Sequence, residues 1–321
     1  MNWQPSASIA TLKKRALLLH KIRHFFAERD VLEVETPLLA SSGITDLHLE
    51  NIECQFTGPG FAKPLNLYLQ TSPEYAMKRL IAAGSGCIYQ LCKAVRNDES
   101  GRFHNPEFSM LEWYRMNFNH HDLMQEVDTF LQQMLACQAA DYLTYQQAFL
   151  MFTHIDPLHC QVTELKKFIK DKGEPDIASV LTSKTDLLQY IFCTHIEHKI
   201  GQETPCFVYH FPAAQASLAK LNKDDLRVAE RFEVYFKGIE LANGFHELTD
   251  KHEQLKRFEQ DNQLRQQAGK EQKPIDHYLL AALENGLPNC AGVALGIDRL
   301  FMLAEQLPHI NEAIAFNITN C

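Results

Sequence analysis

Two glutamates stand in an apolar stretch of the chain where a carboxylate needs an explanation. The stretch runs from residue 235 to residue 250 and reads YFKGIELANGFHELTD, with carboxylates at Glu240 and Glu247. Apolar, glycine-punctuated runs of this kind are typical of a β-sheet, where an unpaired carboxylate is costly to bury. The sequence therefore raises the question of what these two carboxylates bind.

A second group of candidate residues lies in IYQLCKAVRNDESGRFHNPEFSMLEWYR, residues 88–115. The period of a strand places four side chains on one face: Phe108, Met110, Glu112 and Tyr114. Arg96, which ends the partner strand, could bind a phosphate through two hydrogen bonds, while Phe108 could stack a base. Glu112 could take an ammonium group, with Tyr114 hydrogen-bonding beside it. The alternative is a half-solvated sheet face with a chance salt bridge.

The stretch GVALGIDR, residues 292–299, places glycines in a predicted strand that leads into a helix. Glycines inside a strand often mark the close approach of a ligand or of another backbone. Asp298 can cap the following helix, and Arg299 lies at its start, where an anion is also favoured. The alternative is a tight packing turn. Since the chain has no P-loop and no GxGxxG motif, any ATP must bind by another geometry.

The histidines and cysteines carry weaker signals. The pairs His120–His121 and His195–His198 have no matching ligand set, so we interpret them as surface or hydrogen-bonded core residues. HELTD is not the HExxH motif of zinc peptidases. The nine cysteines form no CxxC pair, which favours free thiols in a reducing compartment.

Hydrophobic periodicity predicts the elements that carry these residues. The predicted helices span 8–29, 72–84, much of 122–200, 250–269 and 297–307. The predicted strands span 31–36, 88–98, 107–116, 207–212, 232–248 and 292–296. Ser8 and Ser72 are the expected caps of the first two helices. Strands joined by hairpins indicate an α+β fold, an antiparallel β-sheet flanked by helices.

Length and composition limit the class of protein. The chain has 321 residues, 45% hydrophobic and 22% charged, and we interpret it as one domain, 1–321, with a variable, mostly helical insertion at about 140–205. A net charge of −9 argues against a protein that functions by binding the phosphate backbone of a nucleic acid. Because there is no apolar leader and no run of 18 uncharged apolar residues, we expect a cytoplasmic protein without a membrane partner.

Three stretches together resemble motifs 1, 2 and 3 of the class II aminoacyl-tRNA synthetases. They are the helix and strand ending in Glu35-Thr36-Pro37, the hairpin RNDESGRFHNPEF, and GVALGIDR. TSPEY, HNPEF, ELANGFHEL and GIDR are similar to the lysyl branch. The resemblance covers nearly the whole chain, is weakest at 140–205, and implies the class II synthetase catalytic core.

The predicted motif 1 helix begins almost at residue 8, so we expect no anticodon-binding domain of the kind that lysyl-tRNA synthetases carry. The chain therefore resembles the elongation factor P–lysine ligases, a paralogous family, and the similarity extends to FVYHFPAAQASLA, RVAERFEVY and WQPSAS. Membership implies an enzyme that uses ATP and Mg²⁺ to activate (R)-β-lysine, and α-lysine less well, as an aminoacyl-adenylate. The product is transferred to the ε-amine of a lysine on elongation factor P. The resemblance also implies a homodimer through the motif 1 region and makes tRNA an unlikely partner.

The resemblance assigns roles to individual residues. The ATP-binding positions are Arg96, Asn97, Asp98, Phe108, Glu240, Leu241, Gly296 and Arg299. Among them, Arg96 and Arg299 would be the catalytic clamps on the phosphates, and Glu240 would hold magnesium with ATP. The substrate-binding positions are Ser72, Pro73, Glu74, Tyr114, Glu247 and Ala294, with Glu247 pairing the side-chain ammonium of the substrate.

Three positions depart from the pattern of the synthetases. Asp98 stands where glutamate is usual, which implies a shorter or water-bridged contact. Arg102 lies one residue before the usual arginine position, which Phe103 occupies, so its reach to the phosphates stays open. Ala294 stands where lysyl-tRNA synthetases usually have glycine, and a changed pocket floor fits a changed substrate.

Two other functions stay open at this point. One is a truncated synthetase-like enzyme that charges an RNA acceptor, which the acidic balance disfavours. The other is a catalytically inactive regulatory paralogue. The presence of Arg96, Phe108, Glu240, Glu247 and Arg299 argues against the inactive form.

Overall fold

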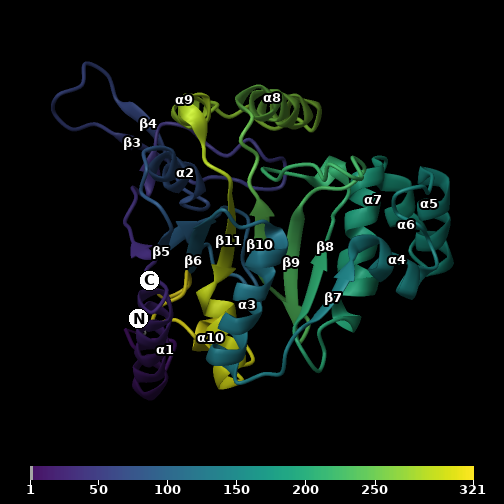
Figure 1. Cartoon of the computed structure of the whole chain (residues 1–321), viewed down its shortest axis with the longest axis horizontal. Helices are drawn as coiled ribbons and strands as arrows, with labels where there is room; N and C mark the ends of the chain where they lie inside the picture. The colour runs from purple at the N-terminus through teal and green to yellow at the C-terminus, as the bar shows by residue number, and fades with distance from the viewer. Residues whose placement is uncertain (1–2) are drawn as a thin grey trace. The chain divides into compact units, whose positions relative to one another are not determined.

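The computed structural model describes residues 3–321. It divides into two compact units: unit 1 comprises the chain up to Phe118 together with Leu248–Cys321, and unit 2 comprises Asn119–Glu247. The prediction of a single domain over the whole chain, with an insertion at about 140–205, stays a prediction. Each unit contains strands, and the elements of both are labelled in Figure 1.

The sheet of unit 1 carries the predicted hairpin. Its strands run in the order β1 (Leu32–Glu33), β5 (Ile88–Val95), β6 (Glu107–Met116) and β11 (Cys290–Gly296). β1 is parallel to β5, whereas β5, β6 and β11 are antiparallel neighbours. A second, three-stranded sheet has the order β2 (Leu39–Ala40), β4 (Leu65–Leu69) and β3 (Glu53–Phe56).

The helices of unit 1 lie on both sides of its main sheet (Figure 1). They are α1 (Ile9–Ala27), α2 (Glu74–Ala82), α8 (Lys251–Gln267), α9 (His277–Gly286), α10 (Ile297–Glu305) and the short η4 (Ile310–Glu312). The side chain of Ser8 accepts a hydrogen bond from the Thr11 amide at 3.0 Å, as expected of the cap of α1. Phe26 of α1 stacks on Tyr89 with ring centroids 4.3 Å apart, so α1 covers one face of the sheet.

An ion pair between a partly buried arginine and a buried aspartate joins the first helix of unit 1 to its last long helix. Arg15 of α1 lies 2.5 Å from Asp298 of α10, and the other carboxylate oxygen of Asp298 accepts the Ser109 amide of β6 at 2.8 Å. Arg15 also donates to the Ala313 carbonyl and to the Ser109 hydroxyl. Both charges are therefore shielded from water and held in a network of hydrogen bonds.

The sheet of unit 2 has the strand order β10 (Ile239–His246), β9 (Arg231–Phe236), β8 (Cys206–Tyr209) and β7 (Asp141–Thr144). β7 is parallel to β8, and the other pairs are antiparallel. The helical elements are α3 (His120–Leu135), α4 (Tyr145–Thr153), α5 (Val162–Asp171), α6 (Pro175–Val180), α7 (Lys184–Ile191), η1 (Phe192–Ile196), η2 (Glu197–Lys199) and η3 (Ala213–Gln215). An apolar core that includes Tyr145, Phe149 and Phe192 packs α4–α7 against Tyr235 of the sheet.

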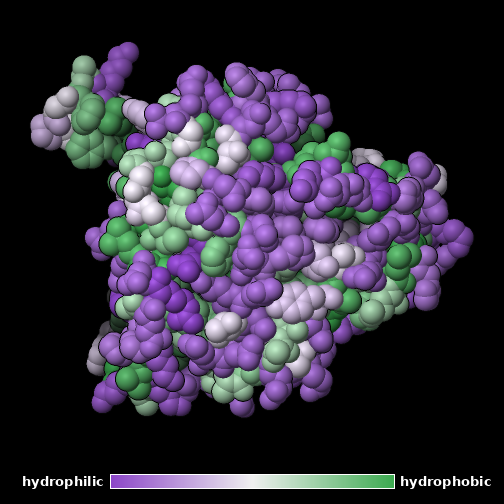
Figure 2. Space-filling view, in the orientation of Figure 1, coloured by the Kyte–Doolittle hydropathy of each residue, from purple (hydrophilic) through white to green (hydrophobic). Residues whose placement is uncertain are grey.

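The surface in view is mostly hydrophilic (Figure 2). Apolar side chains do reach the surface on the hairpin of β3 and β4, which extends from the rest of unit 1 (Figure 1). There Phe56 and Phe61 are exposed and meet edge to face, with centroids 5.9 Å apart. Within residues 3–321, no helix combines the length and the apolar character needed to cross a membrane.

The predicted α+β fold of mainly antiparallel strands and flanking helices is confirmed. The hairpin at 88–98 and 107–116 and the helix after Asp250 are confirmed to within a few residues. The sequence analysis did not predict β7 or α9, and the strand predicted at 31–36 shortens to β1.

Three local predictions are wrong. Residues 232–248 are two strands joined by Lys237 and Gly238, whose positive φ angles of 54° and 73° suit a tight hairpin turn. The N-cap of α2 is Pro73, although the Ser72 hydroxyl still accepts the Glu74 amide at 3.3 Å. Asp298 does not cap α10, because its carboxylate is buried against Arg15 and the Ser109 amide.

The Arg15–Asp298 pair predicts a large effect on stability. Asp298→Asn keeps the shape of the side chain but leaves the partly buried Arg15 without its counter-charge, so we expect a loss of about 3–5 kcal/mol in unfolding free energy. The matched control is Lys14→Ala, because Lys14 pairs with Glu305 at the surface and should contribute no more than about 1 kcal/mol. Urea unfolding midpoints at an unchanged slope give both values. Equal effects of the two variants would contradict the assignment.

Candidate functional site

One face of the unit 1 sheet gathers several of the predicted site residues. β6 pairs in register with both β5 and β11, which places Glu112 opposite Gln90 on one side and Ala294 on the other. Directly opposed residues point to the same face of a sheet. The side chains on this face are therefore Ile88, Gln90, Cys92 and Ala94 of β5, the predicted Phe108, Met110, Glu112 and Tyr114 of β6, and Gly292, Ala294 and Gly296 of β11.

A buried phenol and carboxylate occupy the middle of this face. Glu112 and Tyr114 are each 2% exposed, and the Tyr114 hydroxyl donates to Glu112 Oε1 at 2.7 Å. The hydrogen bond fixes the orientation of both groups. Cys92 lies on the same face, where burial and then the nearby Glu112 raise the pKa of its thiol to about 12. The thiol is therefore neutral near pH 7 and is no nucleophile.

An arginine and an aromatic ring meet at the end of the hairpin. The Arg96 guanidinium lies 5.1 Å from the centroid of the Phe108 ring, and its Nη1 donates to Glu99 at 3.3 Å. A planar base stacked on Phe108 would share this position with the guanidinium. Asn97 donates its amide to the Glu50 carbonyl, and Asp98 takes a left-handed backbone conformation with φ of 65°. The structure therefore brings Arg96 and Phe108 together, and a backbone hydrogen bond of Asn97 stabilises the turn that follows Arg96.

A second arginine reaches the hairpin loop from α10. Arg299 Nε donates to the Phe103 carbonyl at 3.2 Å, and Nη2 hydrogen-bonds to the His104 ring. Gly296 precedes this helix, and a side chain built there would meet only ordinary contacts with Arg299, the nearest at 3.6 Å. Packing within the chain therefore does not require glycine at 296.

The side chain of Arg102, whose role was left open, contacts neighbouring groups of the protein. Its Nε donates to the Pro308 carbonyl at 2.9 Å, and its guanidinium lies 4.8 Å from the centroid of the Phe103 ring. Two contacts with the protein thus hold this side chain between the hairpin loop and the segment after α10.

The start of α2 contains an ion pair that the sequence analysis missed. Glu74 lies 2.6 Å from the ammonium of Lys78, which is buried one helical turn later. The spacing of four residues on a predicted helix was the signal for this pair. Because Lys78 already neutralises Glu74, Glu74 is a weaker candidate than Glu247 for binding a substrate ammonium.

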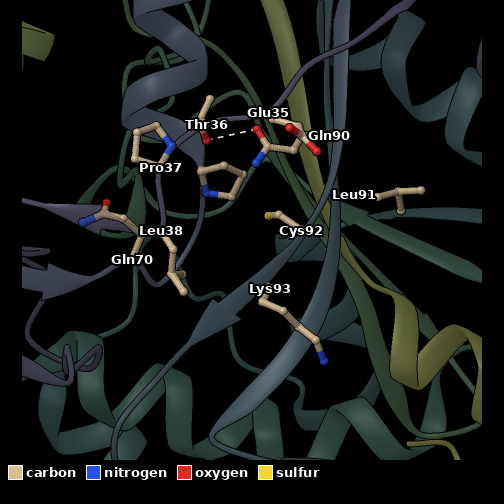
Figure 3. Close-up of a pocket in the computed structure, with 10 residues that line it drawn as sticks. Glu35, Thr36, Pro37, Leu38, Gln70, Gln90, Leu91, Cys92 and Lys93 are labelled. Atoms are coloured by element: carbon tan, nitrogen blue, oxygen red, sulfur yellow. Dashed lines mark hydrogen bonds between the residues drawn. The ribbon is translucent and has the colours of Figure 1, made fainter.

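A pocket of about 300 Å³ lies beside β5 (Figure 3). Its lining residues are Glu35, Thr36, Pro37, Leu38, Gln70, Pro73, Gln90, Leu91, Cys92 and Lys93. The Thr36 hydroxyl donates to the Gln90 side chain at 3.0 Å, the contact drawn as a dashed line. Pro73 is the one predicted binding residue in this lining. The pocket therefore lies between the end of the predicted motif 1, at residues 35–37, and β5 of the hairpin.

Unit 2 holds the other predicted site residues on and after β10. Glu240 is half-buried, Leu241 lies at a shift in the β9–β10 register, and Glu247 is 1% exposed. Glu233 of β9, which the sequence analysis missed, is buried and accepts hydrogen bonds from Arg231 and Tyr235. Burial raises the pKa of Glu233; Arg231 opposes this, and the charge of Glu240 adds to it. The charge of Arg231 has the larger effect of the two, because Arg231 forms an ion pair with Glu233.

The interpretation of His120 and His121 as lacking a ligand set is wrong. One ring nitrogen from each of His120, His121 and His210 lies within 4.8 Å of the others. His120 also forms such a group with Glu230 and His246. The sequence pattern could not reveal these groups, because His210, Glu230 and His246 come from segments of the chain distant from His120. His195 instead lies 3.4 Å from Glu174.

Comparison with known proteins places these features in a family. Residues 1–320 match the family model described as tRNA synthetases class II (D, K and N). A relative from Vibrio parahaemolyticus, named "Elongation factor P--(R)-beta-lysine ligase", is 57% identical over 315 residues, 98% of this chain and 98% of that protein. Proteins of the same name from Vibrio cholerae and Edwardsiella ictaluri are 58% and 55% identical, covering 98% and 99% of this chain and 97% and 98% of their own lengths.

Proposed function

Because the chain belongs to the class II tRNA synthetases (D, K and N), we propose that it is an ATP-dependent ligase that attaches (R)-β-lysine to elongation factor P. The observation that carries the proposal is the similarity, over nearly the full length of both chains, to relatives named for that activity. In the first step, the carboxylate of β-lysine attacks the α-phosphorus of ATP, which forms an aminoacyl-adenylate and releases pyrophosphate. In the second, the ε-amine of a lysine on elongation factor P attacks the adenylate carbonyl, which forms an amide and releases AMP.

The unit 1 face supplies groups suited to ATP. Arg96 and Arg299 are the proposed clamps that neutralise charge on the phosphates, and Phe108 offers a ring on which adenine stacks. Gly296 leaves room for the nucleotide next to α10. Asn97 and Asp98 are assigned to ATP by the family resemblance, as is Leu241. Positioning and charge neutralisation are the main catalytic means in this kind of phosphoryl chemistry.

Glu240 is the proposed magnesium ligand. Its half-buried carboxylate on β10 suits this role, because Mg²⁺ prefers carboxylate oxygens as ligands. Bound with ATP, Mg²⁺ would neutralise charge on the phosphate oxygens.

The substrate side of the proposal rests on Glu247, Tyr114 and Ala294. A carboxylate as buried as Glu247 suits the side-chain ammonium of a lysine-type substrate. Tyr114, oriented by its hydrogen bond to Glu112, supplies a fixed hydroxyl group, and the family resemblance also assigns Ser72 and Pro73 to the substrate. Glu74 contributes shape rather than charge, because Lys78 neutralises it. No enzyme nucleophile is needed, which agrees with the neutral thiol of Cys92.

A homodimer through the motif 1 region is part of the proposal. Large apolar side chains of that region are exposed, and they include Ile9 and Leu17 of α1, Leu32 of β1, and Leu38 and Leu39 at the start of β2. Such a group is favoured at an interface between subunits. A cytoplasmic location follows from a translation factor as the acceptor, and the net charge of −9 disfavours tRNA.

Two assays test the proposed function. ATP–pyrophosphate exchange with (R)-β-lysine separates an active enzyme from an inactive regulatory paralogue. Transfer of labelled β-lysine to purified elongation factor P, compared with transfer to tRNA, separates the protein ligase from an enzyme that charges RNA. Exchange without any transfer to elongation factor P would overturn the proposed acceptor.

The first prediction from the proposed function concerns Glu247. Glu247→Gln keeps the shape of the side chain but removes its charge, so activation of lysine-type substrates should fall about tenfold to several-hundredfold, a loss of roughly 1.5–3 kcal/mol. The KM for ATP should change little. Exchange kinetics measure both, with the exposed Glu203→Gln as the matched control. Unchanged exchange in Glu247→Gln would remove this residue from the pocket.

The second prediction separates the nucleotide half of the site from the amino-acid half. Arg299→Ala removes a phosphate clamp and Phe108→Ala removes the stacking ring, so both should weaken the use of ATP and leave the preference among lysine isomers intact. Exchange rates over a range of ATP and lysine concentrations give the two effects. If either variant lost only amino-acid discrimination, the assignment of the two halves would be reversed.

The third prediction concerns the methyl group of Ala294, which stands opposite Glu112 in the sheet. β-Lysine carries its amino group one carbon further from the carboxylate than α-lysine, and packed pocket walls yield little. Ala294→Gly should therefore shift preference toward α-lysine by about 1–3 kcal/mol, the range for one methylene in a pocket. The measurement is the ratio of kcat/KM for the two isomers in both proteins. A ratio that does not move would make Ala294 a packing residue.

A further inference from the structure

Five polar side chains meet at one end of the unit 2 sheet, and none has a role in the proposed function. They are His120 and His121 at the start of α3, His210 after β8, Glu230 before β9 and His246 at the end of β10. Because β8, β9 and β10 are antiparallel neighbours, the last residues of β8, the first of β9 and the last of β10 lie at the same end of the sheet. The topology thus brings together residues from four separate segments.

The spacing of the imidazole nitrogens suits a tetrahedral metal ion. His120 Nε2 and His210 Nε2 lie 3.2 Å apart. Zinc–nitrogen bonds of about 2.0–2.1 Å in a tetrahedron separate neighbouring nitrogens by about 3.4 Å. A nitrogen of His121 completes a group whose members all lie within 4.8 Å of one another. His121 is exposed, so its ring can turn toward the other two without disturbing a core.

A half-buried carboxylate, Glu230, lies behind the first of these histidines. His120 is 3% exposed, yet its Nδ1 has no hydrogen-bond partner among residues 3–321. The nearest acidic atom is Glu230 Oε2, 3.9 Å away. A metal ion on Nε2 would fix the proton on Nδ1 and direct it at Glu230, and histidine ligands commonly have such a carboxylate behind them. A small shift of the ring would close this contact.

We propose that His120, His121 and His210 bind one Zn²⁺ ion, with Glu230 orienting His120 and with the fourth position open to solvent. Three imidazoles form a ligand set that suits zinc and the neighbouring transition metals, and a tetrahedral site with three protein ligands keeps one position for water. The other possible set, His120, Glu230 and His246, is less suitable, because His246 already bonds to Glu230 and to the Lys220 ammonium at 3.2 Å.

The backbone of His210 agrees with this assignment. His210 holds a left-handed conformation with φ of 59°, which costs energy in a residue other than glycine, and its ring lies against that of His120.

The test uses the full chain with no purification tag, stripped of metal with a chelator and then dialysed. Titration with Zn²⁺ against a chromophoric chelator should give one tight site per chain, and Zn²⁺ should raise the Tm. Co²⁺ should give the visible absorption of a tetrahedral site without a thiolate charge-transfer band. These readouts do not depend on ligase activity, so a failure here leaves the proposed function untouched.

Variants assign the ligands. His121→Ala changes an exposed residue, and His210→Asn keeps a side chain that tolerates positive φ, so both should fold. Each should lower zinc affinity at least a hundredfold, and Glu230→Gln should lower it about 10–100-fold at unchanged stoichiometry. His198→Ala, at an exposed histidine of the same unit, is the matched control and should change nothing.

Three outcomes would overturn the proposal. They are the absence of saturable zinc binding, binding that persists in both His121→Ala and His210→Asn, and a thiolate band in the cobalt spectrum. The last would assign the metal to exposed cysteines such as Cys193 or Cys321.

Discussion

The register of β6 between β5 and β11 is the constraint on which the candidate site depends. The face that carries Glu112 and Tyr114 exists only because Trp113, between them, points to the opposite face, where Phe26 of α1 packs against its ring at 5.4 Å. A slip of one residue would turn the carboxylate into that apolar layer and bring Trp113 out of it. Burial of one face of the strand thus determines what the other face can offer to a ligand.

The Arg15–Asp298 pair links the position of β6 to that of Arg299, the second arginine of the site. Asp298 accepts the amide of Ser109 on β6, and Arg299 is its neighbour on α10. The start of α10 is therefore tied to β6, and Arg299 in turn reaches Phe103 and His104 in the hairpin loop. A buried pair is weak evidence for net stability, but it can specify one arrangement over others, because its partners tolerate no other place in the core. Here the arrangement that it specifies is the one that brings an arginine of α10 to the loop between β5 and β6.

The sequence predicted what depends on local periodicity. The alternation in β6 was sufficient to group Phe108, Glu112 and Tyr114, and Ser8 was sufficient to start α1. It could not predict features that depend on distant partners. Asp298 has the spacing of a helix cap, but Arg15 and Ser109 determine its role. His120 and His210 are 90 residues apart, and no spacing rule connects them. The Lys237-Gly238 turn was missed for another reason: its lysine is an unusual residue at positive φ.

Glu230 and Glu233, the two carboxylates of RVAERFEVY, show that residue type and spacing alone do not determine the role of an acidic side chain. Burial acts to raise the pKa of Glu230, but the hydrogen bond from His246 and the nearby imidazoles outweigh it and keep the pKa low. Glu230 is therefore ionised, and it can orient a histidine. Burial also raises the pKa of Glu233, where the charge of Arg231 opposes this effect and the smaller contribution of the Glu240 charge adds to it. Glu233 accepts hydrogen bonds from Arg231 and Tyr235, whereas Glu230 lies among imidazoles. The neighbours of each carboxylate therefore determine what it can bind, and its position in the sequence does not.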